Sequence, residues 1–463
     1  MLTYDLDRRG KLARYDYLYR CIREDILAGR LTAGEKLPSK RSLASHLQTA
    51  VITVQNAYAQ LEAEGYLYTR EKRGYYVADV ERHPAAPGRA PARSAPQPQR
   101  SWLLDLSSGG SGTEDFPFSV WAKLMRRVLS EEGEALLRAT PPNGADALRR
   151  AIAQHLYRFR GISAAPEQIV VGAGIEYLLG CLAHLFSDGM AAIENPGYFR
   201  TRTVLQNSGI PCTLVDIDRE GLPADALEKS GANLCYLTPS HHFPTGVTMP
   251  ATRRAQLLAW AAARPGRYIL EDDYDSEFRF DTRPLPSLQG MAGPDGPVVY
   301  LTTFSKSLAP GIRIACMVLP QSLLARYRRD FATYANTVSR FEQQTLCEFM
   351  AGGYFTRHLA RMRLAYKRRM EAFAAALRAA LPGVELDGVH SGLHFLLTLP
   401  GAGGERAMVA AAAQQGVRLR GLSEYYLARP ELCRADTVVA GYSALKEDDV
   451  EKVAQALARA WLS

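Results

Sequence analysis

With 463 residues, 47% of them hydrophobic and 22% charged, and a formal net charge of +8, the chain has the composition of a soluble globular protein with more than one domain. No apolar run approaches the roughly 20 residues that span a bilayer, and the N-terminus lacks a signal peptide's apolar segment, so we expect a cytoplasmic protein without a membrane partner. The seven cysteines are scattered without ligand spacing, which favours reduced thiols over a disulfide framework or a metal site.

The first 80 residues predict three helices followed by a hairpin. A first helix spans about residues 15–28, a second begins at the N-cap Ser39, and a third runs from about 51 to 64. Two short strands, 66–68 and 75–77, flank a basic turn. This order is typical of a winged helix-turn-helix, although other small three-helix domains share the periodicity.

Positive charge is concentrated at the same end of the chain. Residues 1–80 contribute a net +3 and residues 81–100 another +3, which is three quarters of the excess and favours a polyanion partner. Residues 81–101 contain five prolines and little that could fill a core, which indicates a tether. We therefore expect domains at 1–80 and 103–463, joined by a linker over 81–102.

Three runs, at 26–31, 34–44 and 57–67, resemble the GntR-type DNA-binding domain. In that family the arginine matching Arg41, the start of the third helix and the wing glycine meet DNA. Ala50-Val51 occupies the positions where that helix usually opens with a Ser/Thr-Arg pair. This departure argues against direct readout of guanine by an arginine at that point. The alternative is that Lys40 and Arg41 only form a solvated face of the second helix. The candidate DNA-binding residues are Lys40, Arg41, Thr53, Gln55, Asn56, Lys72, Arg73 and Gly74.

From Trp102 onward short β-rich runs alternate with helices, which predicts a doubly wound α/β domain. A mainly helical region, about 321–380, and a smaller α+β part follow it. The expected strands of the main domain are 169–171, 191–194, 212–217, 234–237, 268–271, 297–301 and 314–319, and those of the smaller part lie near 394–399, 417–419 and 438–441.

Lys306 lies between two of these buried strands, beside small hydroxyl residues. A desolvated lysine amine loses its proton near neutral pH and can form an imine with an aldehyde. Thr303, Ser305 and Arg313 could hold a phosphate next to it, and the glycine turn before the helix at 175 offers backbone N–H groups to the same anion. The alternatives are a solvated lysine and a glycine turn kept for steric reasons.

Residues just after parallel strands converge on one crevice of such a fold. Pyridoxal phosphate chemistry needs an imine lysine, a carboxylate for the ring nitrogen, an aromatic face and a phosphate cup. Lys306 and Asp272, with Asp273 in reserve, supply the first two, and Tyr198 supplies the ring face. The predicted cup consists of Gly174, Ile175, Glu176, Thr303, Ser305 and Arg313.

Together these motifs resemble the fold-type-I aminotransferases, and more narrowly the MocR/GabR regulators, in which a GntR domain precedes an aminotransferase-like domain. The segments that carry the resemblance are 194–198, 238–246, 271–278, 303–306 and 441–445. The resemblance implies a head-to-tail homodimer and paired DNA half-sites. Phe243 replaces the asparagine that bonds the cofactor's ring hydroxyl in aminotransferases, so that bond falls to Tyr274 or another group.

These features give a first hypothesis, a transcriptional regulator that senses an amine-bearing metabolite through an aldimine on Lys306. The alternatives are a working aminotransferase with an accessory DNA-binding head, and a regulator whose effector is pyridoxal phosphate itself. Amine ligands of this fold usually carry an acidic group, for which Arg200 and Arg420 are the predicted partners. Arg202 and Arg418 are the neighbouring alternatives, and all four could be surface arginines.

Overall fold

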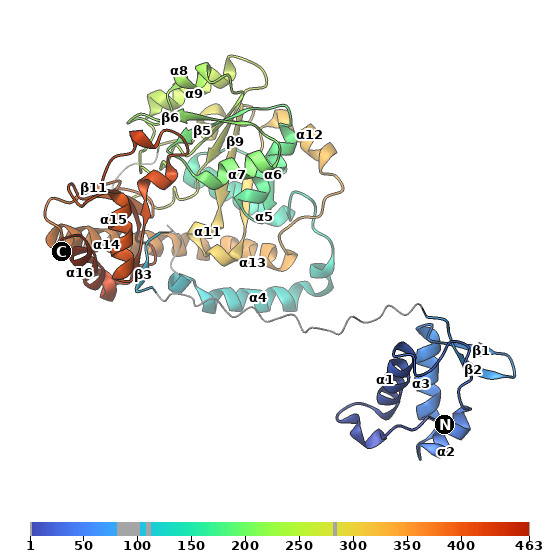
Figure 1. The fold of residues 1–463 in the computed structure, drawn as a ribbon. Helices are drawn as coiled ribbons and strands as arrows, with labels where there is room; N and C mark the ends of the chain where they lie inside the picture. The colour runs from blue at the N-terminus through green and yellow to red at the C-terminus, as the bar shows by residue number, and fades with distance from the viewer. Residues whose placement is uncertain (1, 81–101, 108–112, 281–284, 463) are drawn as a thin grey trace. The chain divides into compact units, whose positions relative to one another are not determined.

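The computed structural model describes residues 2–80, 102–107, 113–280 and 285–462. The chain divides into two compact units, Met1–Gln99 and Arg100–Ser463, which are described separately below (Figure 1). The predicted linker lies outside the described residues apart from Trp102, so its boundaries stay a prediction.

The N-terminal unit has the predicted three helices and a hairpin. Its elements are η1 (Leu6–Arg9), α1 (Arg14–Leu27), α2 (Lys40–His46), α3 (Val51–Ala63), β1 (Leu67–Arg70) and β2 (Gly74–Val77). The two strands pair antiparallel and extend further into the basic turn than expected, so that only residues 71–73 connect them.

Local chemistry explains these boundaries. The Ser39 hydroxyl accepts a hydrogen bond from the Ser42 N–H at 3.1 Å and starts α2 as predicted. Gly29 and Gly65 adopt positive φ angles of 78° and 77° just past the ends of α1 and α3, a backbone conformation that favours glycine. The core of the unit is made by one apolar stripe from each helix, with Leu47 only partly buried at its edge.

The C-terminal unit is built on a seven-stranded sheet of order β4-β10-β9-β8-β7-β5-β6. All neighbouring strands are parallel except β10, which is antiparallel to both β4 and β9. The strands are β4 (Ile169–Gly172), β5 (Ala191–Asn195), β6 (Cys212–Asp216), β7 (Leu234–Leu237), β8 (Tyr268–Asp272), β9 (Val298–Thr303) and β10 (Ala315–Val318).

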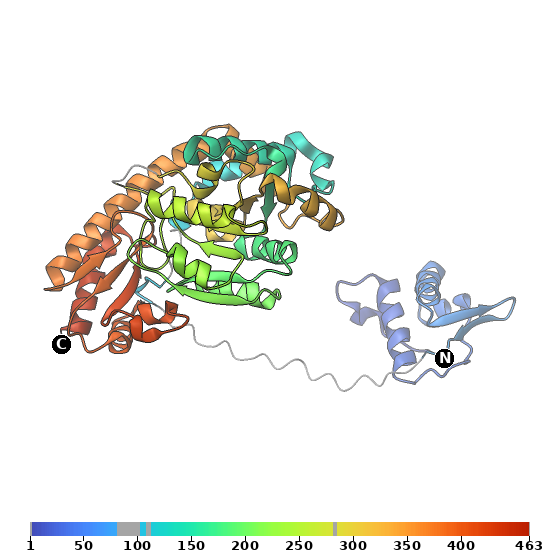
Figure 2. The same cartoon turned by 90° about the horizontal axis from the view of Figure 1, so that it is seen from above.

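Helices cover both faces of this sheet, which confirms the doubly wound α/β prediction. Alternating residues of the strands pack to opposite sides, so that Val170 faces the α6 and α12 side while Ile169 and Val171 face α5 and α13. Figure 2 shows the sheet between its helical layers. The helices are α4 (Phe118–Glu132), α5 (Asp146–Arg160), α6 (Ile175–Leu185), α7 (Phe199–Asn207), α8 (Ala224–Lys229), α9 (Ala251–Ala262), α10 (Leu288–Ala292), α11 (Phe304–Ser307), α12 (Gln321–Asp330) and α13 (Arg340–Ala351).

A smaller four-stranded sheet of order β11-β12-β15-β14 follows the long helix α14 (Tyr354–Ala380). Its remaining elements are β11 (Glu385–Asp387), β12 (His394–Thr398), α15 (Glu405–Gln414), β14 (Arg420–Gly421), β15 (Thr437–Gly441) and α16 (Val450–Trp461).

The prediction of a single strand over 417–419 is wrong. It is divided at Leu419 into β13 (Val417–Arg418), which pairs with β3 (Leu104–Asp105), and β14, which pairs with β15. The partner of β13 comes from the start of the unit, more than 300 residues away, so local pattern could not indicate the division. Across the part of the chain that the structure describes, no helix is both long and apolar enough to cross a bilayer.

Candidate functional site

The predicted site segments meet at one edge of the large sheet. Strands β5, β7, β8 and β9 are parallel and therefore end on the same side of the sheet. Strand β4 points in the same direction, because β10, which lies between β4 and β9, is antiparallel to both. The segments that leave this edge are 196–198, 238–246, 273–275, 304–306 and the turn 173–174 before α6. The convergence expected from strand order is thus present.

Lys306 lies on the short helix α11, directly after β9. Thr303 caps this helix, because its hydroxyl oxygen accepts a hydrogen bond from the Ser305 N–H at 3.1 Å. Desolvation lowers the pKa of the Lys306 amine, an effect that Asp275 opposes and the charge of Arg200 reinforces. A lysine of lowered pKa beside a cluster of polar groups has the properties of an amine nucleophile.

Asp272 is the last residue of β8 and is buried. The Tyr236 hydroxyl donates to its Oδ2, while Oδ1 is buried without a hydrogen-bond partner among the described residues. Burial raises the pKa of this carboxyl to about 7. An unpartnered buried carboxylate oxygen favours a cationic N–H donor, which is what a protonated ring nitrogen provides.

Asp273, the reserve candidate, has a structural role instead. Its Oδ2 lies 2.7 Å from Arg160 Nε and accepts a hydrogen bond from the Tyr300 hydroxyl at 2.6 Å. Arg160 and Tyr300 are both buried, so this ion pair lies inside the domain. Asp272 is therefore the carboxylate available at the site.

Tyr198 supplies an aromatic ring at the end of the β5 segment. Its ring centroid lies 5.5 Å from that of Phe243, and the two rings meet edge to face. Phe243 also packs edge-on against Tyr274, at 6.4 Å between centroids, and offers no hydrogen bond from its side chain. The Tyr274 hydroxyl instead donates to the His241 backbone carbonyl at 3.2 Å.

The turn before α6 is closed by Arg313. Gly174 has a φ of 101°, and a Cβ placed on it would lie 2.3 Å from Arg313 Nη2, so only glycine lets the guanidinium approach this closely. Arg313 Nη2 is 3.1 Å from a Glu176 carboxylate oxygen. An anion at this turn would therefore compete with Glu176 for Arg313, and would find the backbone N–H groups of Ile175 and Glu176 beside it.

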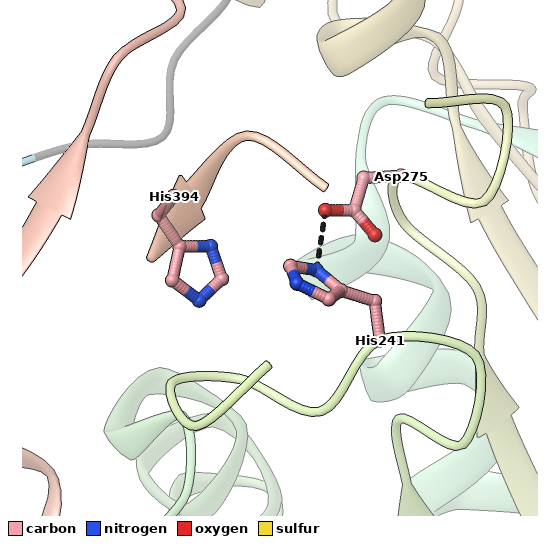
Figure 3. A group of neighbouring side chains, drawn as sticks. All are labelled: His241, Asp275 and His394. Atoms are coloured by element: carbon pink, nitrogen blue, oxygen red, sulfur yellow. Dashed lines mark hydrogen bonds and ion pairs between the residues drawn. The ribbon is translucent and has the colours of Figure 1, made fainter. Parts of the chain in front are cut away.

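Three buried side chains that the sequence did not single out, His241, Asp275 and His394, lie close together (Figure 3). Asp275 Oδ2 is 2.9 Å from His241 Nδ1, and the His394 ring centroid lies 4.8 Å from that of His241. His394 Nε2 is 3.0 Å from the Pro244 carbonyl oxygen. Both Asp275 and the His394 imidazole interact electrostatically with Lys306. The sequence signals were the segments 238–246 and 271–278, which contain His241 and Asp275.

The same three side chains could offer ligand atoms to a metal ion, since one atom from each lies within 4.8 Å of the others. Two observations favour a hydrogen-bonded cluster instead. Asp275 already bonds His241 Nδ1, and the Pro244 carbonyl already bonds His394 Nε2. The absence of a metal stays a prediction.

The two predicted effector arginines lie near the Tyr198 ring. The Arg200 guanidinium is exposed and lies 5.9 Å from the Tyr198 ring centroid. Burial raises the pKa of the Tyr198 hydroxyl, and the charges of both Arg200 and Arg420 oppose that rise. The segment after Arg420 is joined to the residue before Tyr198 by a hydrogen bond from the Gly197 N–H to the Tyr425 carbonyl at 2.9 Å. Arg420 also forms an ion pair with Glu424 at 3.1 Å.

The alternative arginines are engaged elsewhere. Arg418 pairs with Asp105 at 3.1 Å and packs over the Trp102 ring. Arg202 Nη1 lies 3.5 Å from the Leu427 carbonyl. Of the four candidates, Arg200 and Arg420 are thus the two that the structure brings to Tyr198.

The predicted DNA-binding residues occupy three elements of the N-terminal unit. Arg41, on α2, is exposed, whereas Lys40 is half-buried with its Nζ 5.7 Å from the Tyr75 ring centroid. The exposed polar residues of α3 are Gln55 and Asn56, with Thr53 half-buried beside them. Lys72 and Arg73 lie in the turn between β1 and β2, where Arg73 is exposed, and Gly74 begins β2. Lys72 (φ 57°) and Gly74 (φ 104°) both have positive φ angles.

The fold and the site at its sheet edge define a domain of the aminotransferase class I and II family, whose model matches residues 103–457, while the model for bacterial regulatory proteins of the gntR family matches residues 14–77. The chain belongs to the MocR-type transcriptional regulators, which join these two domains.

Two relatives and one solved structure illustrate the match. The chain is 32% identical to the regulatory protein MocR of Rhizobium meliloti, over 99% of this chain and 96% of that one. It is 34% identical to the transcriptional regulator TauR of Rhodobacter capsulatus, over 83% and 84% of the two chains. The C-terminal unit resembles α-aminoadipate aminotransferase LysN of Thermus thermophilus, complexed with N-(5'-phosphopyridoxyl)-L-leucine, with a TM-score of 0.67, 26% identity and coverage of 78% and 92%.

Proposed function

We propose that this regulator binds operator DNA through its N-terminal unit and holds pyridoxal 5'-phosphate on Lys306 in its C-terminal unit. An amino acid or related amine that reaches the cofactor would be the effector. The observation that carries the proposal is the juxtaposition at one sheet edge of a lysine with a lowered pKa and a buried carboxylate oxygen, Asp272 Oδ1, that lacks a partner among the described residues.

The residues at this edge fit the cofactor part by part. Asp272 Oδ1 would accept a hydrogen bond from the ring N–H, and Tyr198 would lie against the ring. The bond to the cofactor's ring hydroxyl would fall to Tyr274 or another group. The phosphate would lie at the Gly174 turn, with Arg313 released from Glu176 to bind it. When bound, the cofactor supplies an electrophilic carbon for amines and a chromophore that reports their arrival.

Lys306 would provide the resident amine, and the incoming effector amine would take its place. The proton that the effector must lose needs an acceptor, and Asp275, which interacts electrostatically with Lys306 and is bonded to His241, is a candidate for that role. Displacement of Lys306 would change the electrostatics at the start of α11. Such a change can shift the equilibrium between two arrangements of the protein that bind DNA differently.

A working aminotransferase is the weaker candidate. The Phe243 side chain stands where aminotransferases place a hydrogen-bonding asparagine, and it packs among aromatic rings instead. We expect amines to bind without many rounds of turnover.

One experiment tests the function as a whole. Full-length protein loaded with pyridoxal phosphate is mixed with a panel of amino acids, amines and aminosulfonates, and the absorption spectrum, operator binding and keto-product yield are measured together. We expect at least one compound to change both spectrum and DNA binding with at most one product per site. Product that accumulates over many turnovers would favour the aminotransferase, and spectral change without any effect on DNA would remove the sensing role.

Asp272→Asn tests the ring contact. The substitution keeps the shape of the side chain and removes the charge that would stabilise a protonated ring nitrogen, so we expect cofactor affinity to fall by about 1.5–3 kcal/mol. Tyr236→Phe is the matched control, because it removes the donor to Asp272 Oδ2 and leaves the carboxyl group in place. Equilibrium dialysis with pyridoxal phosphate measures both. Equal affinities for Asp272→Asn and wild type would mean that the ring nitrogen lies elsewhere.

A further inference from the structure

The first turn of α3 exposes two apolar side chains. Val51 retains 43% of its accessible surface and Ile52 retains 57%, although both are aliphatic. The core beneath the helix is filled by Val54, Ala57 and other residues of the opposite stripe, all of them fully buried. Val51 and Ile52 are therefore not needed to complete the core of the unit.

The exposed face continues one turn later with two carboxamides. Residues three to four positions apart lie on the same side of a helix, so Gln55 and Asn56 lie next to Val51 and Ile52. Both carboxamide side chains are exposed. No charged residue occurs between positions 47 and 61, so this face of α3 is uncharged, whereas the neighbouring candidates on α2 and in the turn between β1 and β2 are cationic.

An uncharged helix face in a unit whose neighbouring elements carry cations matches the chemistry of a DNA groove. Cations suit the phosphate backbone, and the floor of the major groove carries no charge. The one apolar group on that floor is the C5-methyl of thymine, and carboxamides pair with the N6 and N7 edge of adenine. Thymine and adenine are thus the bases that the side chains of this face can recognise.

We propose that Val51 and Ile52 contact thymine methyl groups in the major groove and, with Gln55 and Asn56, give the operator half-site a core of A·T base pairs. This inference rests on the proposed DNA-binding function and adds its base preference. It also accounts for the missing Ser/Thr-Arg pair, since aliphatic side chains at the start of α3 replace guanine readout by methyl readout.

The experiment removes the methyl group alone. Full-length protein is used to select a binding site from random duplexes, and each thymine of that site is then replaced in turn by deoxyuridine. We expect at least one replacement to weaken wild-type binding about fourfold, the value of one buried methyl-sized group. Ile52→Ala or Val51→Ala should bind the thymine and deoxyuridine duplexes equally at that position, because the contacting group is gone.

Two controls keep the result interpretable. Leu27→Ala alters another aliphatic residue that is 43% exposed, at the end of α1, and should keep the wild-type preference for thymine. Arg41→Ala should weaken binding to the thymine and deoxyuridine duplexes by the same factor. Because Ile52 is exposed and alanine is a strong helix former, the Ile52→Ala variant should fold.

The inference is overturned if wild-type protein binds its selected site with no response to any deoxyuridine, while DNA binding itself stands. It is also overturned if Ile52→Ala and Val51→Ala both keep the full preference for thymine. Failure of wild-type protein to bind any duplex above background would overturn the proposed DNA-binding function along with it. If Ile52→Ala instead changes the oligomeric state and leaves DNA binding intact, the exposed face is a protein contact.

Discussion

Lys306→Ala is expected to abolish the covalent fixation of pyridoxal phosphate by borohydride. Borohydride makes permanent the bond between an aldehyde and an amine, so the adduct marks the lysine that holds the cofactor. Desolvation lowers the pKa of the Lys306 amine, and loss of a proton near neutral pH is what this bond requires. Peptide mass mapping of the reduced protein should find the adduct on Lys306 in wild type and no adduct in the variant.

The matched control is Lys229→Ala. The Lys229 amine is largely exposed and pairs only with Asp225, one turn away on α8, so its removal should leave the adduct unchanged. Lys306→Ala should still bind operator DNA, since the two matched domains are separate along the chain. An adduct of wild-type yield in Lys306→Ala would place the cofactor on another amine and end the site assignment.

The sheet edge could be predicted from sequence because its parts follow strands. Parallel strands end together, so the residues after each apolar run had to meet, whatever the details of the loops. The choice between Asp272 and Asp273 could not be made in this way. It depends on Arg160, 113 positions earlier in the chain, whose buried guanidinium forms an ion pair with Asp273 and not with Asp272.

Side-chain pairing across the fold limits the rest of the prediction in the same way. The cluster of His241, Asp275 and His394 joins a loop after β7, a loop after β8 and a strand of the smaller sheet. Strand order brings the two loops to one edge, but no pattern in the chain indicates that His394 meets them. The pairing of Glu176 with Arg313 is a further case. Both Glu176 and Arg313 were predicted to take part in phosphate binding. In the structure the Glu176 carboxylate pairs with the Arg313 guanidinium, a contact that the sequence alone does not indicate.

This pairing has a consequence for cofactor binding. If Arg313 binds the cofactor phosphate as proposed, it would exchange the Glu176 carboxylate for phosphate, so the net gain would be smaller than for an arginine that begins without a partner. Ala173 and Ile175 offer no hydroxyl to compensate, and the backbone N–H groups at the start of α6 become the main fixed donors. We infer that the cofactor is held chiefly by its ring end, through Lys306 and Asp272.

The second large effect is expected from Arg200→Ala, which should raise the effector concentration needed for the spectral change. A desolvated carboxylate or sulfonate needs a cationic fork, and Arg200 lies 5.9 Å from the Tyr198 ring, where an amine bound at the cofactor would direct its acidic end. Because the Arg200 guanidinium is exposed before the effector binds, we expect its removal to cost about 1.5–3 kcal/mol of effector binding, the range for a hydrogen bond to a charged group. Titration of the cofactor absorption band with the active amine measures the loss.

Arg418→Ala is the matched control for this titration, because Arg418 is committed to Asp105 and the Trp102 ring. It should respond to the effector as wild type does. Arg420→Ala should show a partial loss of effector binding, since the charge of Arg420 acts on the Tyr198 hydroxyl but is paired with Glu424. The absorption band of bound cofactor and operator binding without effector should be unchanged in Arg200→Ala. A wild-type response from that variant would show that the acidic end of the effector is bound elsewhere, and a response lost only in Arg420→Ala would assign it to the smaller sheet.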